Sequence, residues 1–154
     1  MQQRKIHILI VDDNKFYRKG LMLTLNRLLR YCEIDEVCSA KECLCYLHKR
    51  MPDLVFMDIK MPEMDGVTAT RKALEINQSI KIIALSMYVN PQYMMDMILA
   101  GAKGYILKDF ETNELTIAVE TVMDGRNYYS AKALEKFKQQ DLASIANQYS
   151  YPDI

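Results

Sequence analysis

The sequence has no excess of charge of either sign. Among its 154 residues, 20 lysines and arginines balance 20 aspartates and glutamates, so the formal net charge is zero. A broad attraction to nucleic acid or to an anionic membrane needs a surplus of basic side chains. The composition does not indicate such attraction, and we expect any contact with DNA to come from elsewhere.

Long hydrophobic runs and metal-binding cysteine pairs are also missing. No apolar run approaches the length of a membrane span, and the N-terminus lacks the long apolar region and cleavage site of a signal peptide. The four cysteines have no paired CxxC spacing, and Cys43 and Cys45, two apart on an expected helix, cannot face one metal ion. We therefore expect a cytoplasmic protein with reduced thiols and no membrane contact.

What the chain does have is a short apolar segment that ends in a carboxylate. Residues 54–57 are too few for a helix and lie between Pro52 and the breakers Pro62 and Gly66, which predicts a buried strand. A buried parallel strand delivers the next residue, Asp58, to the sheet edge where α/β folds bind their ligands. Asp58 is therefore the candidate for chemistry. The alternative is that it only caps the following turn.

Strand-like and helix-like segments alternate along the chain. Half of the residues are hydrophobic, which suffices for the core of one domain. The alternation predicts a doubly wound α/β fold with right-handed crossovers. A sixth, polar helix and a tail are expected after Ser130. Five strands are expected at residues 6–11, 33–38, 54–57, 80–85 and 105–107, with the acidic second strand at an edge.

Polar side chains follow the expected strands at one edge of the sheet. Asp12 and Asp13 follow the first strand, Asp58 the third, Ser86 the fourth and Lys108 the fifth. Three carboxylates repel one another unless a cation joins them, and an all-oxygen set suits Mg²⁺. A carboxylate can also accept a phosphoryl group when the charge on the phosphoryl oxygens is neutralised. The lysine ammonium, the serine hydroxyl and Mg²⁺ would supply that neutralisation.

These residues resemble the receiver domains of two-component response regulators. The Asp12-Asp13 pair, Asp58 with Met61-Pro62 and Asp65-Gly66, Ser86, and the segment 104–108 match in order and spacing over about residues 5–125. The resemblance implies a flavodoxin-like (CheY-like) sheet of five parallel strands in the order 2-1-3-4-5. It places the receiver domain at 1–127 and a C-terminal helix and tail at 128–154.

The resemblance also implies a role for each site residue. Asp58 would be the phosphoacceptor, and Asp13, Asp58 and the Lys60 backbone carbonyl would bind Mg²⁺, with Asp12 acting through water. The phosphoryl group would be contacted by Ser86 and Lys108, and the switch pair would be Ser86 and Tyr105. Lys60 and Tyr88, each two positions beyond a key residue, would tune the rate of dephosphorylation.

The segments 101–109, 122–125 and 128–130 are most similar to receivers of the NarL/FixJ (LuxR-type) subfamily. Such receivers usually precede a helix-turn-helix DNA-binding domain, and this chain stops near the place where that domain begins. We expect a linker helix to an output domain outside this chain. The alternative is a naturally single-domain regulator or scaffold. The implied partners are a sensor histidine kinase and, on phosphorylation, a second copy; the protein would catalyse only its own phosphorylation and dephosphorylation.

Two other classes fit the residues less well. A phosphatase of the haloacid-dehalogenase type needs an acid two residues after the nucleophile, where this chain has Lys60. A flavodoxin needs a hydroxyl-rich phosphate loop where Asp12 and Asp13 stand.

The chain departs from the receiver pattern at two positions. Ser86 replaces the commoner threonine but keeps the hydroxyl. Asp109 stands where many receivers have a cis proline, and a cis bond before a non-proline residue costs about 2.5–4 kcal/mol. The sequence alone leaves the geometry of that loop open.

Overall fold

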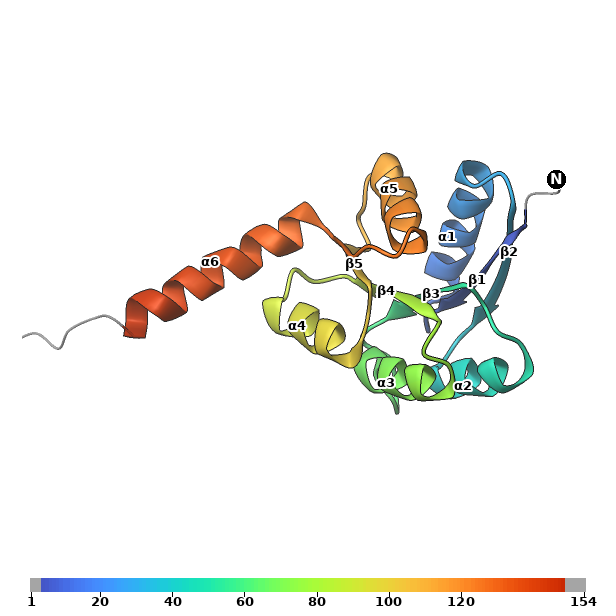
Figure 1. Cartoon of the computed structure of the whole chain (residues 1–154), viewed down its shortest axis with the longest axis horizontal. Helices are drawn as coiled ribbons and strands as arrows, with labels where there is room; N and C mark the ends of the chain where they lie inside the picture. Colours follow the sequence, from blue (N-terminus) through green and yellow to red (C-terminus); the bar gives the residue numbers. More distant parts are fainter. Residues whose placement is uncertain (1–3, 149–154) are drawn as a thin grey trace, which may run out of the picture.

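The computed structural model describes the backbone of residues 4–148 and the side chains up to residue 140. Strands and helices alternate as the sequence predicts (Figure 1). The tail expected at the C-terminus lies outside the described residues from position 149 onward. The elements are β1 (Ile6–Val11), α1 (Lys15–Leu28), β2 (Cys32–Val37), α2 (Ala40–Lys49), β3 (Leu54–Asp58), α3 (Gly66–Ile76), β4 (Lys81–Ser86), α4 (Pro91–Ala100), β5 (Gly104–Leu107), α5 (Thr112–Met123), β6 (Tyr128–Tyr129) and α6 (Ala131–Gln148).

The strands form one parallel sheet in the order β2-β1-β3-β4-β5-β6. The predicted fold and the order of the first five strands are confirmed, and β6 is a small addition. It pairs with β5 at Gly104–Tyr128 and Tyr105–Tyr129, so the sheet continues past residue 127. Two residues are too few to show a strand period, which is why the sequence did not reveal β6. β6 therefore occupies the sheet edge at which the predicted order 2-1-3-4-5 ends with β5.

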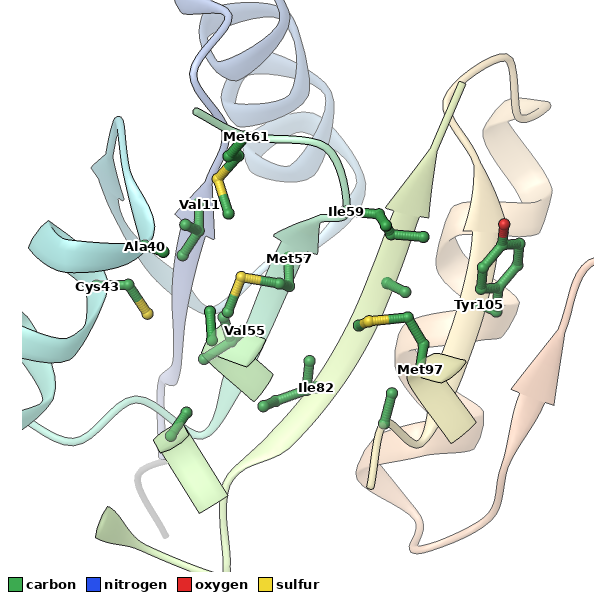
Figure 2. Packing of buried hydrophobic residues seen from close by; sticks show 14 of the residues in the cluster. Val11, Ala40, Cys43, Val55, Met57, Ile59, Met61, Ile82, Met97 and Tyr105 are labelled. Carbon is green, nitrogen blue, oxygen red and sulfur yellow. The ribbon is translucent and has the colours of Figure 1, made fainter. Parts of the chain in front are cut away.

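Helices cover both faces of the sheet, with α1 and α5 on one side and α2, α3 and α4 on the other (Figure 1). Alternate residues of a strand point to opposite faces. Thus Ile8 and Ile10 of β1 belong to the cluster beneath α1 and α5, whereas Leu9 and Val11 belong to the cluster beneath α2 to α4. Figure 2 shows the second cluster. Burial on both faces explains why the strands read as continuous apolar runs.

The helix expected after Ser130 is present as α6. Ser130 is buried, its backbone N–H donates to the Tyr105 carbonyl oxygen at 2.8 Å, and its own carbonyl oxygen accepts from Leu134 N–H at 2.9 Å. Leu134 and Phe137 pack on the cluster beneath α4, and the rest of α6 projects away from the sheet (Figure 1). Across residues 4–148, no helix combines the length and apolar character needed to cross a membrane.

Candidate functional site

Three carboxylates meet at the carboxyl ends of two neighbouring strands. Because β1 and β3 pair with Val11 opposite Met57, the residues that follow them, Asp12 and Asp58, lie side by side. One oxygen atom from each of Asp12, Asp13 and Asp58 lies within 4.8 Å of the others. Asp12 is 0% exposed and Asp58 5%, whereas Asp13 is exposed. An oxygen-only cluster with one solvent-facing member fits Mg²⁺, which keeps several waters.

Lys108 brings a positive charge to the same site. Its Nζ atom lies 2.6 Å from Asp12 Oδ2 and 3.3 Å from Asp58 Oδ1, and its side chain is only 11% exposed. The backbone N–H of Lys108 donates to the Ser86 carbonyl oxygen at 2.7 Å, which ties the residue to the end of β4. The ammonium offsets part of the repulsion between the two buried carboxylates.

Burial and neighbouring charge make Asp58 unusually basic. Its pKa is raised from 3.8 to about 7, first because the carboxyl is removed from water and then because Asp12 lies nearby; Lys108 acts in the opposite direction. A carboxyl with this pKa is close to half protonated at neutral pH. A bound cation would favour its ionised, nucleophilic form.

A close backbone approach and three hydrogen bonds hold the segments that carry Asp12 and Asp58. Gly66 N–H donates to the Ile59 carbonyl oxygen at 2.7 Å, and a Cβ atom at Gly66 would lie 2.1 Å from the Asp58 carbonyl oxygen. The Asp12 carbonyl oxygen accepts from Arg18 Nη1 at 2.7 Å, and Asp12 Oδ1 accepts from Asn14 N–H at 2.8 Å. The glycine after Asp65 is therefore required by space.

Ser86 and Tyr105 share one acceptor. The Ser86 hydroxyl donates to the Tyr88 carbonyl oxygen at 2.8 Å, and the Tyr105 hydroxyl donates to the same atom at 3.3 Å. Tyr105 is 0% exposed, and Figure 2 shows its hydroxyl at the end of the sheet where Ile59 follows β3. Because β6 pairs with β5, the Tyr105 ring does not lie at an open edge of the sheet, and its role as a switch residue stays a prediction.

Lys60 and Tyr88 lie together beside the site, in the company of Tyr93. The exposed Lys60 places Nζ 5.1 Å from the ring centroid of Tyr88 and 5.1 Å from that of Tyr93. Tyr93, in the first turn of α4, was not predicted.

The described residues contain no cis peptide bond, so the Lys108–Asp109 peptide is trans.

Tyr17 is a second site residue that sequence reasoning missed. Its ring centroid lies 4.5 Å from Lys108 Nζ. The one signal for it in the sequence is its place four residues after Asp13, within the first turn of α1.

A large hollow lies away from these residues. It measures about 850 Å³ and is lined by the start of β1 and the ends of α1 and α5, including Ile6, Leu29 and Met123. Since these segments lie at the amino ends of the strands, the hollow takes no part in the carboxylate site. Chemistry rather than size identifies the candidate site.

Comparison with known proteins decides the family, because residues 8–120 match the response regulator receiver domain. The chain belongs to the receiver family. This receiver is 38% identical over 108 residues to the transcriptional regulatory protein YhcZ of Bacillus subtilis, covering 70% of this chain and 50% of that protein. It is 30% identical over 132 residues to the transcriptional regulatory protein DegU of Brevibacillus brevis, covering 86% and 56%.

Solved structures agree with the fold and the subfamily. A LuxR-family two-component response regulator from Aurantimonas sp. SI85-9A1 superposes with a TM-score of 0.84 at 25% identity, over 90% of this chain and 99% of that chain. The predicted resemblance to NarL/FixJ (LuxR-type) receivers is confirmed. The receiver spans about half the length of the two curated relatives, 50% and 56%.

Proposed function

We propose that the receiver is a phosphorylation-operated switch in which Asp58 accepts a phosphoryl group from a sensor histidine kinase. An oxygen of Asp58 attacks phosphorus while the bond from phosphorus to the donor's imidazole nitrogen breaks, and the imidazole leaves with that electron pair. The observation that carries the proposal is the buried Asp58 carboxylate between Asp12, Asp13 and the Lys108 ammonium. Phosphoryl transfer needs positioning and charge neutralisation more than acid or base chemistry.

Some of the residues around Asp58 would bind Mg²⁺, and others would contact the phosphoryl group. Asp13, Asp58 and the Lys60 backbone carbonyl would hold Mg²⁺, with Asp12 acting through water; the ion supplies charge neutralisation to the phosphoryl oxygens. Lys108 already contacts Asp58 at 3.3 Å and would take a phosphoryl oxygen as its partner. Ser86 would turn its hydroxyl from Tyr88 toward the phosphoryl group. Each contact adds a donor or cation where negative charge accumulates.

A protein donor fits the surface beside the site. Phe16, in the first turn of α1, is 89% exposed, and Leu23 on the same helix is 72% exposed. A kinase that brings a phosphohistidine to Asp58 would cover this face, because α1 starts two residues after Asp13. The receiver would work in the cytoplasm and catalyse only its own phosphorylation and dephosphorylation.

The output of the switch would be transcriptional. Residues 1–127 would form the receiver unit, and 128–154 the link to a helix-turn-helix domain outside this chain. In support, the match covers only 56% and 50% of two curated relatives, and both carry the name transcriptional regulatory protein. Regulation by protein contact alone is the alternative. A chain that alters a partner's activity without any DNA-binding domain would favour that alternative.

Intact-mass measurement after incubation with acetyl phosphate and Mg²⁺ tests the proposal. We expect one phosphoryl group, located at Asp58 after reduction with borohydride and peptide mapping. Asp58→Asn should take up none, because an amide cannot act as the carboxylate nucleophile. Lys108→Ala should keep its Mg²⁺ affinity yet respond weakly to phosphorylation. An unlabelled wild type, or a label that persists in Asp58→Asn, would overturn the assignment.

A further inference from the structure

Tyr17 contacts Lys108 at two points. The Tyr17 ring centroid lies 4.5 Å from Lys108 Nζ, and the Tyr17 hydroxyl donates a long hydrogen bond of 3.5 Å to the Lys108 carbonyl oxygen. The two residues are 91 positions apart in the sequence, so this contact exists only in the folded sheet. It joins the start of α1 to the end of β5.

Tyr17 is itself fixed by the carboxylate site. Its backbone N–H donates to Asn14 Oδ1 at 3.0 Å, and Asn14 N–H donates to Asp12 Oδ1 at 2.8 Å. Asp12 Oδ2 in turn accepts from Lys108 Nζ at 2.6 Å. The chain of contacts closes on itself, so the tyrosine ring and the buried carboxylate hold the same ammonium from two directions.

The Tyr17 ring can hold the Lys108 ammonium without adding a negative charge, which a carboxylate cannot do. A lysine side chain is a flexible stem with a strongly hydrated charge, and Lys108 has lost most of its water at 11% exposure. The negative face of an aromatic ring attracts a cation without adding net charge. A third carboxylate in this place would compete with the phosphoryl group for the Lys108 ammonium. The ring does not, because it accepts no ammonium hydrogen that a phosphoryl oxygen would need.

The hydroxyl of Tyr17 stays neutral in this position. Burial raises its pKa far above the ordinary value of 10, and the charges of Asp12, Asp58 and Asp109 raise it further. The group therefore remains a hydrogen-bond donor toward the Lys108 carbonyl oxygen at any working pH, and it never adds a negative charge beside Asp58.

We propose that Tyr17 is a positioning residue for phosphoryl transfer, which holds the Lys108 ammonium over Asp58 so that an incoming phosphoryl group meets a preset cation. The inference rests on the proposed function of Asp58. Tyr17 does not touch the reacting atoms itself. Because the half-buried ring also packs against the cluster beneath α1 and α5, its positioning role has to be separated from packing.

Two substitutions separate the ring face from apolar bulk. Tyr17→Leu keeps an apolar side chain and removes the ring, whereas Tyr17→Phe keeps the ring and removes the hydroxyl. We expect Tyr17→Leu to weaken binding of beryllofluoride, in the presence of Mg²⁺, by about tenfold, within the range measured for cation–π contacts. The acetyl phosphate reaction should slow by a similar factor. Tyr17→Phe should restore most of both, and Mg²⁺ affinity without beryllofluoride should change less than twofold.

The control is Tyr31→Leu, at an exposed tyrosine in the turn between α1 and β2. It should match wild type in every measurement. A double-mutant cycle adds a readout that packing alone would not move. In a Lys108→Ala background, Tyr17→Leu should no longer slow the acetyl phosphate reaction, because the ring has no ammonium left to place. Equal effects of Tyr17→Leu in both backgrounds would overturn the proposal.

A measurement on the wild type keeps the test valid if Tyr17→Leu does not fold. The Lys108 ε-methylene protons should show an upfield ring-current shift in the NMR spectrum of the unphosphorylated protein. Unshifted protons would refute the contact. Failure of the wild type to bind beryllofluoride or accept phosphate would instead refute the function of Asp58, and a normal wild type with an unaffected Tyr17→Leu would refute only the role of Tyr17.

Discussion

At the scale of single residues, the basic character of Asp58 makes metal binding depend on pH. With a pKa of about 7, Asp58 holds a proton below neutrality that Mg²⁺ has to displace. We expect Mg²⁺ affinity to rise from about pH 6 to about pH 8, by at most about tenfold per pH unit, and then to level off. Calorimetric titration in buffers of different ionisation enthalpy would also count the released proton. A flat profile for the wild type would contradict this expectation.

The raised pKa of Asp58 also makes the stability of the metal-free protein depend on pH. Between the ordinary value of 3.8 and about 7, the folded state keeps a proton on Asp58 that the unfolded chain has released. The free energy of unfolding should therefore fall as pH rises through this window. Asp58→Asn is the control for both measurements, since an amide does not titrate.

Gly66 tests how closely the loop after β3 is built around Asp58. A Cβ atom there would lie 2.1 Å from the Asp58 carbonyl oxygen and 2.9 Å from Ile59 Cα. Backbone atoms cannot yield as a side chain does, so Gly66→Ala should lower the free energy of unfolding by about 1–3 kcal/mol and weaken Mg²⁺ binding. Denaturant unfolding and Mg²⁺ titration would measure the two effects.

Gly20 provides the matched control within the same chain. It lies in α1 with no atom within 4 Å of an added Cβ. Gly20→Ala should therefore stabilise the protein by about 0.4–1 kcal/mol, through helix propensity and a less flexible unfolded chain. If Gly66→Ala and Gly20→Ala changed the free energy of unfolding by the same amount, the close approach at Gly66 would not affect stability.

At the scale of elements, the loops after β3 and β4 meet through Lys60 and Tyr88. Lys60 Nζ lies 5.1 Å from the Tyr88 ring, and both side chains are exposed. We expect them to obstruct the approach of water to phosphorylated Asp58. Replacement of both by alanine should speed phosphate loss severalfold. Intact-mass measurements at intervals after removal of acetyl phosphate would give the rate. The pair Lys72→Ala with Tyr31→Ala is the control. An unchanged rate would show that the two side chains do not cover the path.

The sequence predicts elements well where burial imposes a pattern. The apolar runs at β1, β3 and β4 and the polar residues that follow them placed Asp12, Asp58 and Ser86 at one edge, because strand ends converge in a parallel sheet. It failed where a contact depends on the assembled fold. β6 is two residues long and has no period, and the approach of Tyr17 to Lys108 joins segments that no local pattern connects.

At the scale of the whole molecule, the site is joined to the C-terminal helix through Tyr105. The Tyr105 hydroxyl shares the Tyr88 carbonyl oxygen with Ser86, and the Tyr105 carbonyl oxygen accepts from Ser130 N–H at 2.8 Å. If Ser86 turns toward a phosphoryl group, the Tyr88 carbonyl oxygen loses the Ser86 hydroxyl as a donor. Among the side chains that the structure describes, Tyr105 is then the one that still donates to it. We expect phosphorylation of Asp58 to favour, by this route, one arrangement of β5, α4 and the start of α6.

The output that we expect from this coupling is association of two receivers, because DNA-binding output domains commonly act in pairs. Tyr105→Ala should leave phosphorylation of Asp58 nearly intact but weaken association that depends on phosphorylation. Since the ring is fully buried, its loss also costs stability of about 3–5 kcal/mol. The companion variant is therefore Tyr105→Phe, which removes only the hydroxyl that donates to the Tyr88 carbonyl oxygen. Sedimentation with and without beryllofluoride measures the response. A phosphorylation-dependent shift of equal size in wild type and both variants would rule out the coupling, because the association cannot depend on Tyr105 if it survives the loss of the ring.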